Sequence, residues 1–280
     1  MLSEKTILDN FEIEKILEFF PKSGQKQVVL VQHKRYGKVV LKIVKNQNER
    51  VAREIQIVTE NNFPNVPKVL EVNTYDIDSQ KGLYLFEEYI EGTGLRSITD
   101  NGIMNLPDAM DLTEQLLQVI VAMEKKRIVH RDIKPDNIIK ANDGRWCLID
   151  FGIARALNME SLTYTAARIG PHTPGYGAPE LFQYTKKDID SRADIFSLGV
   201  VVFEAVTGKH PFIRGDELDL NEIWYNTVTI TPQAVEIDGD RDMQFMGLLQ
   251  TFMQKHITRR PETALKAYEW FESVKNYIVG

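Results

Sequence analysis

The chain has 280 residues, of which 43% are hydrophobic and 26% charged, and its formal net charge is −6. These values are ordinary for a soluble globular protein with one large domain or two lobes. The acidic balance argues against a general nucleic-acid binder, and no window approaches the roughly 18 to 20 apolar residues of a membrane span.

Cys147 is the only cysteine, so an intrachain disulfide cannot form. It lies in the apolar run 146–149, and we therefore predict a buried structural thiol rather than a reactive one. A chain without disulfides fits the reducing cytoplasm. The first five residues lack the basic start and apolar stretch of a secretory signal, so we expect a cytoplasmic protein without a membrane partner.

The first 90 residues are predicted to be rich in β-strands, with one helix. Residues 49–60 have helical spacing, with Val51, Ile55 and Val58 on one face. A polar turn is predicted at 76–82, between the last two strands, and a linker at 91–94. The predicted strands are 11–20, 27–33, 38–44, 69–75 and 83–90.

Helices dominate after the linker. The segment 191–207 is so apolar that burial on most sides is expected. Pro107 lies near the start of another helix, a position where proline is tolerated. The pattern therefore predicts an α+β protein with a β-rich region at 1–90 and a helical region at 91–280. The predicted helices are 106–126, 191–207, 244–255 and 263–277.

A short polar loop at 130–137, with the sequence HRDIKPDN, carries the strongest chemical signal. Transfer of a phosphoryl group needs a carboxylate that orients the nucleophilic hydroxyl and oxygen ligands that hold Mg²⁺. Asp132 and Asn137 can supply both, and Pro135 would stiffen the loop between them. Asp150, at the end of the apolar run, adds a second carboxylate.

Three strings in this order and spacing, H-R-D-x-K-x-x-N, then D-F-G at 150–152 and A-P-E at 178–180, resemble the catalytic core of protein kinases. The lysine in the first string is similar to that of Hanks-type serine/threonine kinases, and the activation segment resembles that of bacterial ones. The resemblance covers about residues 11–275 and implies a bilobal protein kinase fold. It implies transfer of the γ-phosphate of ATP, with Mg²⁺, to serine and threonine hydroxyls of protein substrates.

The resemblance also assigns roles within the catalytic loop. Asp132 would be the catalytic base, and Lys134 would neutralise charge on the γ-phosphate. Asn137 and Asp150 would be the Mg²⁺ ligands, since both offer hard oxygen donors. Asp194 would brace the backbone of the loop from the buried helix.

The strand that ends at Lys42 resembles the V-A-I-K strand of the family. Lys42 would pair with the α- and β-phosphates of ATP, and Glu54 on the following helix would position its ammonium. Backbone groups of Glu88 and Ile90 would bind adenine at the hinge. Glu87 occupies the position beside the adenine pocket, or Phe86 does if the register slips by one. The remaining nucleotide contacts are expected from Ser23, Gly24, Val28, Val40 and Ile139.

The phosphate-covering loop departs from the family pattern G-x-G-x-x-G-x-V. With Val28 as the valine, its glycines are replaced by Pro21, Ser23 and Lys26, and only Gly24 offers free backbone torsions. This departure puts the affinity for the nucleotide in question more than the chemistry.

The activation segment resembles that of kinases that autophosphorylate on two threonines separated by one residue. Thr163 and Thr165 are the expected sites, and Arg131 would contact the phosphate. Thr173 would bond near the catalytic loop. Glu180 and Arg260 would form a buried ion pair.

Two alternative functions remain open on the sequence. The altered glycine loop favours a pseudokinase, a scaffold that keeps the fold without transfer. A small-molecule phosphotransferase would share the aspartate and asparagine, but that group lacks the A-P-E segment present here. For a protein kinase we expect protein substrates, no nucleic acid, and transient self-association during autophosphorylation.

Overall fold

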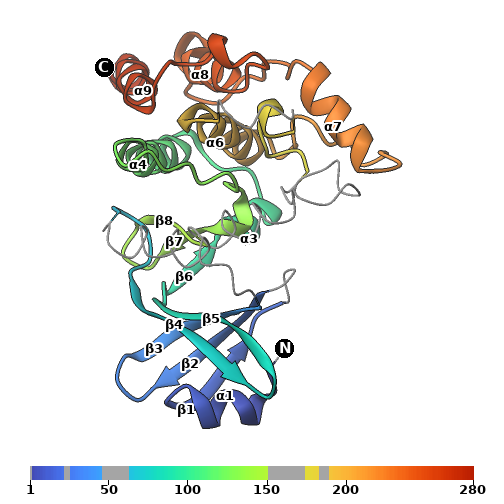
Figure 1. The fold of residues 1–280 in the computed structure, drawn as a ribbon. Helices are drawn as coiled ribbons and strands as arrows, with labels where there is room; N and C mark the ends of the chain where they lie inside the picture. Colours follow the sequence, from blue (N-terminus) through green and yellow to red (C-terminus); the bar gives the residue numbers. More distant parts are fainter. Residues whose placement is uncertain (1, 22–25, 46–62, 151–173, 183–188) are drawn as a thin grey trace. The chain divides into compact units, whose positions relative to one another are not determined.

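The computed structural model describes residues 2–21, 26–45, 63–150, 174–182 and 189–280. The chain divides into two compact units (Figure 1). The segment Val66–Glu91 belongs to the first unit, and Gly92–Asp150, which follows it directly, belongs to the second. The first unit is built around a five-stranded sheet, and the second is mainly helical. The predicted α+β class is therefore confirmed.

The sheet of the N-terminal unit is antiparallel, with the strand order β1-β2-β3-β5-β4. The predicted helix at 49–60 lies outside the described residues. The elements of this unit are α1 (Glu4–Asn10), β1 (Ile13–Phe19), β2 (Lys26–His33), β3 (Gly37–Val44), β4 (Val69–Ile77) and β5 (Gln80–Glu88).

Helix α1 covers one face of this sheet and was not predicted from the sequence. Its N-terminus is capped by Ser3, whose hydroxyl accepts a hydrogen bond from the Thr6 N–H. Ile7 from the helix and Phe11 from the following turn are buried against the sheet. Apolar residues at alternate positions of the strands meet them, so this face of the sheet is a hydrophobic core. The strand residues of that core are Ile13, Val29, Val31, Val39, Leu41, Ile43, Tyr75 and Phe86.

The turn between β4 and β5 is shorter than predicted. The strands pair as far as Ile77 and Gln80, so the prediction of a polar turn over 76–82 is wrong. Asp78 and Ser79 alone form the connection, with φ angles of 50° and 61°. Two successive positive φ angles match the twist of paired strands, which lets both strands continue to the turn.

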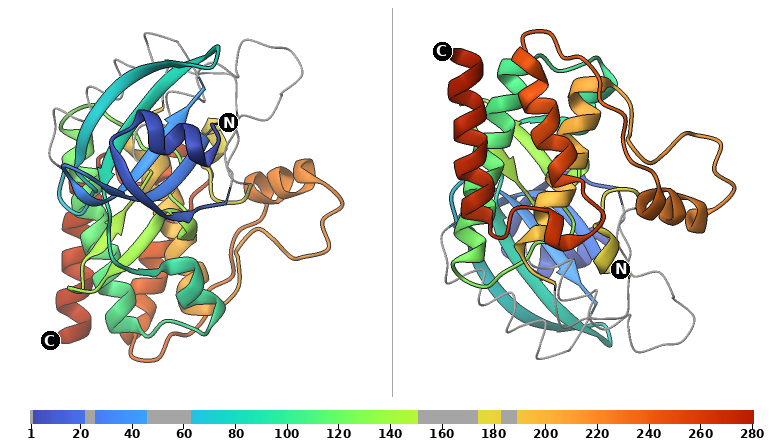
Figure 2. Two further views of the ribbon diagram at one scale, coloured as in Figure 1. Left: turned by 90° about the horizontal axis from the view of Figure 1, so that it is seen from below. Right: turned by 90° about the horizontal axis from the view of Figure 1, so that it is seen from above.

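The described part of the C-terminal unit is built around packed helices and a small sheet. Helices α4, α6, α8 and α9 pack side by side, and α7 extends away from them (Figure 2). The elements are β6 (Gly92–Gly94), α3 (Leu95–Asp100), α4 (Leu106–Glu124), η1 (Pro135–Asn137), β7 (Ile138–Ala141), β8 (Trp146–Leu148), η3 (Pro179–Leu181), α6 (Ser191–Thr207), α7 (Leu220–Thr229), η4 (Arg241–Met243), α8 (Gln244–Phe252), η5 (Ile257–Arg259) and α9 (Ala264–Val279).

Helix α6 has the bounds predicted from the sequence, and most of its residues are buried. The side chain of Asp190 accepts a hydrogen bond from the Arg192 N–H at the start of the helix, and Gly208 ends it with φ 68°. Cys147 is fully buried, as predicted. None of the helices in the described ranges combines the length and apolarity needed to cross a membrane.

The division between the two units falls within the predicted linker at 91–94, between Glu91 and Gly92, but most of this segment is a strand. Gly92–Gly94 forms strand β6, which pairs with β7. A Cβ atom at Gly92 would lie 2.2 Å from the carbonyl oxygen of Lys140. A glycine is therefore required where the two strands approach most closely.

Candidate active site

The carboxylate of Asp132 is held by two neighbours in its own loop. Asn137 Nδ2 donates hydrogen bonds to the Asp132 backbone oxygen at 2.8 Å and to its Oδ2 at 2.9 Å. Lys134 Nζ lies 3.1 Å from the same Oδ2. Contacts to an ionised carboxylate are the strong kind of hydrogen bond, so the orientation of the Asp132 side chain is well defined.

Asp194 on α6 fixes the backbone of this loop. Its carboxylate, which is fully buried, accepts hydrogen bonds from the backbone N–H groups of His130 at 2.7 Å and Arg131 at 2.8 Å. Arg131 has φ 69°, a left-handed conformation that a side chain disfavours. The two hydrogen bonds to Asp194 stabilise that conformation just before Asp132.

His130 is a structural member of the loop. Burial lowers the pKa of its imidazole to about 4, although Asp132 and Asp150 act in the opposite direction. The ring is therefore neutral near pH 7. A neutral ring can accept a hydrogen bond, and His130 Nδ1 accepts one from the Asp132 N–H at 3.3 Å.

Asn137 is connected to the segment that carries Asp150. The backbone oxygen of Asn137 accepts a hydrogen bond from the Ile149 N–H at 2.8 Å, one residue before Asp150. Because Nδ2 of Asn137 is directed at Asp132, its amide oxygen Oδ1 is directed elsewhere. That oxygen and the Asp150 carboxylate are hard donors of the kind that Mg²⁺ binds, so the donor set fits the predicted ion.

A magnesium ion at this position would need further ligands. Among the described residues, no group of three or more His, Cys, Asp or Glu side chains is placed to hold a metal ion. Mg²⁺ commonly keeps several waters and is bound through one or two carboxylates together with substrate phosphates. The predicted pair of Asn137 and Asp150 would supply the protein ligands of such a site.

Three of the predicted nucleotide residues, Val28, Val40 and Lys42, share one face of the sheet of the N-terminal unit. Val28 is directly opposite Lys42 in the β2–β3 ladder, and Val40 precedes Lys42 by two positions on β3. Residues that are directly paired across two strands, and residues two positions apart on one strand, point to the same side of a sheet. This face is opposite the one that α1 covers.

Glu87 lies on the same face as Lys42. It is directly opposite Val40 in the β3–β5 ladder, and its Oε2 lies 2.5 Å from Lys42 Nζ. Phe86 belongs to the core beneath α1, where its ring centroid is 4.5 Å from that of His33. Of the two residues considered for the position beside the nucleotide, Glu87 is therefore the one that shares the face of Lys42.

The predicted hinge residues follow at the end of β5. The Glu88 N–H donates to the Lys68 backbone oxygen at 2.9 Å, so this N–H is already bonded within the N-terminal unit. Ile90 is buried, with 8% of its surface exposed. In the C-terminal unit, Ile139 lies on β7 opposite Cys147.

Several predicted site residues lie outside the described residues, so their contacts stay predictions. They are Ser23, Gly24, Glu54, Thr163, Thr165 and Thr173.

An ion pair connects Glu180 of the A-P-E segment with Arg260. The two guanidinium nitrogens of Arg260 lie 2.6 Å and 2.9 Å from the two carboxylate oxygens of Glu180. Arg260 Nη1 also donates to the backbone oxygen of Arg192 at 3.0 Å. The Arg260 side chain is completely buried, so this bidentate pair anchors the segment to the helical unit.

A second network, not predicted from the sequence, lies beside this segment. Arg96 donates to Tyr176 Oη at 2.6 Å and to Glu204 at 3.0 Å, and the Tyr176 hydroxyl donates to Glu204 at 2.5 Å. Burial and the Glu204 carboxylate raise the pKa of Tyr176 above its usual value. Arg96 and Glu204 are 108 positions apart in the chain, so no local pattern could have connected them.

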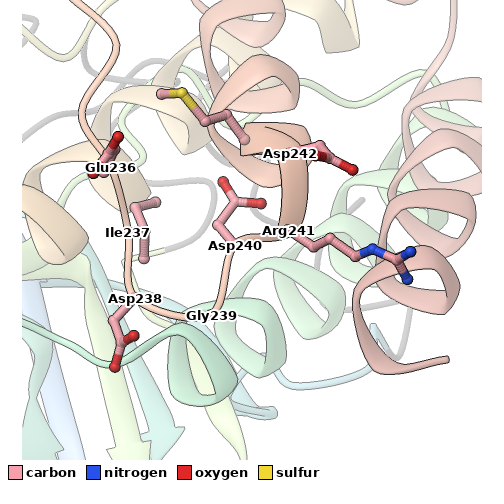
Figure 3. A pocket seen from close by; sticks show the side chains of 8 residues that line it. Glu236, Ile237, Asp238, Gly239, Asp240, Arg241 and Asp242 are labelled. Atoms are coloured by element: carbon pink, nitrogen blue, oxygen red, sulfur yellow. The ribbon is translucent and has the colours of Figure 1, made fainter.

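An acidic pocket of about 800 Å³ lies in the segment 236–243 (Figure 3). Its carboxylates point in different directions rather than toward one centre. Asp240 accepts hydrogen bonds from the N–H groups of Phe245 and Met246, at 2.9 Å each, at the start of α8. The pocket is explained by this helix cap and contains none of the predicted site residues. Its acidic lining residues are Glu236, Asp238, Asp240 and Asp242.

Comparison with known proteins agrees with this geometry. The chain is 36% identical over 183 residues to the serine/threonine-protein kinase PrkC of Bacillus subtilis, and this alignment covers 62% of the chain and 27% of PrkC. It is 31% identical over 223 residues to the serine/threonine-protein kinase PknB of Mycobacterium leprae, covering 76% of the chain and 35% of PknB. The aligned part is about a third of the length of these relatives. The family model for the protein kinase domain matches residues 23–272, and the chain therefore belongs to the protein kinase domain family.

Proposed function

We propose that the chain is the catalytic domain of a serine/threonine protein kinase, which transfers the γ-phosphate of ATP to hydroxyl groups of protein substrates. Membership of the family and the similarity to bacterial serine/threonine kinases support this activity. The observation that carries it is the Asp132 carboxylate, which Lys134 and Asn137 hold in a loop whose backbone is bound to Asp194.

In this proposal Asp132 accepts the proton of the substrate hydroxyl as that oxygen attacks the γ-phosphorus, and the bond from the γ-phosphorus to the β–γ bridging oxygen breaks so that ADP leaves. Lys134, whose ammonium lies 3.1 Å from Asp132, places positive charge where the transferred phosphoryl group becomes more negative. Asn137 Oδ1 and Asp150 are the proposed ligands of Mg²⁺, which when bound would neutralise charge on the phosphates.

The N-terminal unit is proposed to bind the nucleotide. Lys42 would contact the α- and β-phosphates, with Val28 and Val40 against the base and backbone groups of Glu88 and Ile90 bonded to its edge. Ile139 would contact the base from the C-terminal unit, and Ser23 and Gly24 would cover the phosphates. Because ATP and a reducing environment are both cytoplasmic, we propose this location for the domain.

Autophosphorylation on Thr163 and Thr165 is part of the proposal. Arg131 precedes Asp132, and its guanidinium would contact the resulting phosphate through charge-assisted hydrogen bonds. Encounter of two copies of the chain would suffice for this reaction. Phosphosite mapping after incubation with Mg²⁺-ATP tests it, and the absence of phosphate on both threonines would contradict it.

The proposed activity is tested by incubation of the purified protein with radiolabelled ATP, Mg²⁺ and a general protein substrate. Asp132→Asn and Asp150→Ala should each reduce transfer by about three or more orders of magnitude while the thermal unfolding transition is retained. Wild-type-like labelling of the substrate by either variant would contradict the assignment. Nucleotide binding without any transfer by the wild type would favour the pseudokinase alternative, for which the altered glycine loop is the supporting observation.

A further inference from the structure

The ion pair between Lys42 and Glu87 is formed within one sheet. Lys42 on β3 is directly opposite Leu85 on β5, and Glu87 is two positions further along β5. The two charged side chains are therefore diagonal neighbours on one face, a distance that long side chains bridge. The backbone hydrogen bonds of the β3–β5 ladder fix the Cα positions of Lys42 and Glu87 relative to each other.

This pair is almost completely removed from water. The side chains of Lys42 and Glu87 are only 5% and 6% exposed, and the charged atoms are 2.5 Å apart. Removal of an isolated charge from water is strongly unfavourable, and the attraction between the two groups offsets part of that cost for each of them. The β5 carboxylate consequently restricts where the Lys42 ammonium can lie.

We propose that Glu87 is a positioning residue for Lys42, and that it holds the ammonium in the orientation in which Lys42 contacts the ATP phosphates. This inference rests on the proposed function, in which Lys42 binds the nucleotide. Glu87 is a carboxylate partner supplied by the strand next to Lys42, in addition to the partner expected from Glu54. The sheet itself then orients the lysine, because β3 and β5 are adjacent strands of one ladder.

The first test measures the state of Lys42 without ATP. An amine-reactive anhydride attacks only the neutral amine, and loss of a carboxylate at this distance favours the neutral form. Glu87→Gln preserves the side-chain shape and removes the charge, so acylation of Lys42 at pH 8, followed by peptide mass spectrometry, should become faster by about tenfold or more. The other lysines of each sample serve as internal references.

Glu71→Gln is the matched control for this measurement. Glu71 lies on β4 of the same sheet, directly opposite Phe86, and accepts hydrogen bonds from the hydroxyls of Tyr36 and Tyr84. It therefore faces the side opposite Lys42, and its loss should leave acylation of Lys42 unchanged. An equal rate in the wild type and Glu87→Gln would overturn the proposal.

The second test is kinetic. Loss of one charge-assisted contact to Lys42 should lower kcat/KM for ATP about tenfold to a hundredfold in Glu87→Gln. Glu87→Asp retains the negative charge on a shorter side chain, so its kcat/KM for ATP should lie between those of the wild type and Glu87→Gln. If Glu87→Gln does not fold, Glu87→Asp replaces it in this test. Unchanged kinetics in both variants would overturn the proposal. Failure of the wild type to transfer phosphate would instead contradict the proposed function, because the acylation result does not depend on ATP.

Discussion

At the scale of single residues, the Asp132 carboxylate of the catalytic loop has two polar neighbours of different character. Asn137 fixes the Asp132 carboxylate through a neutral amide, whereas Lys134 contributes a full positive charge. An amide can orient the carboxylate but cannot offset the charge of a phosphoryl group. The two neighbours should therefore have separable effects on the reaction.

We expect Lys134→Met to lower kcat about a hundredfold to a thousandfold, since removal of one preorganised donor to a transition state has effects of this size. The KM for ATP should change much less, because the charge acts mainly on the group in transfer. Steady-state kinetics with a protein substrate measures both constants. Lys140→Met is the control, because Lys140 forms a half-exposed pair with Asp108, and such pairs contribute little. Equal kcat values for the two variants would contradict the role of Lys134.

At the scale of secondary-structure elements, short strands and turns depend on local steric limits. Strand β6 has only three residues, and its first residue lies against the backbone of β7. A side chain at Gly92 would meet the Lys140 carbonyl, which cannot move without disturbing the pairing of β7 with β8. The three-stranded sheet that carries Ile139 therefore depends on this glycine.

Gly92→Ala should lower the free energy of unfolding by about 1–3 kcal/mol, the usual penalty for overpacking a close contact. Gly94→Ala is a control within the same strand, because no atom lies within 4 Å of the position of its Cβ. It should change stability by less than about 1 kcal/mol. Urea denaturation of the three proteins measures the difference, and similar midpoints for both variants would show that β6 can shift to accept the methyl group.

Three charged side chains, those of Arg260, Asp194 and Asp240, form buried connections between elements. Arg260 joins Glu180 of the A-P-E segment to the backbone at Arg192. Asp194 joins α6 to the catalytic loop, and Asp240 caps α8. In each case a charged side chain accepts or donates several hydrogen bonds at once, which compensates for its removal from water.

At the scale of the whole molecule, acid should destabilise the folded protein through its buried histidines. His210 is packed against Tyr176, and its Nδ1 accepts hydrogen bonds from the N–H groups of Phe212 and Ile213. Burial, aided by the positive charge of Arg96, lowers the pKa of His210 to about 3. Protonation would place a buried charge there and break the hydrogen bonds to Nδ1. The pKa of buried His130 is also lowered, so this residue likewise makes the folded protein less stable as the pH falls.

The pKa of His210 is lower in the folded state than its usual 6.5, so the unfolded chain binds a proton first as the pH falls. The stabilisation from the neutral ring is complete above pH 6.5 and is lost progressively toward pH 3. Between pH 6.5 and 4.5 the wild type should lose about 2 kcal/mol more stability than His210→Asn, whose amide oxygen can accept the same bonds. Denaturant titrations at several pH values test this. Parallel pH profiles for the two proteins would contradict the assignment of His210 as an acid-sensitive group.

The sequence by itself determined the α+β class, the family and the composition of the catalytic loop. Helix α6 could be predicted to the residue because a long apolar run with a capping aspartate and a terminal glycine is a local signal. The contacts of Asp132 with Asn137 and Lys134 are local, because the three residues lie within eight consecutive positions. Local patterns of this kind need no knowledge of the rest of the fold.

Only the tertiary structure decided the features that depend on distant segments. The sequence predicts no strand at β6 because three residues with two glycines carry no periodicity, and its pairing partner β7 lies more than 40 positions later. Glu87 and Lys42 are 45 positions apart, and a shift of one residue in the β3–β5 register would have exchanged Glu87 for Phe86. The register of a strand is set by its pairing and by which of its faces is covered. Here α1 covers the sheet face that carries Phe86, so Glu87 lies on the opposite face, beside Lys42.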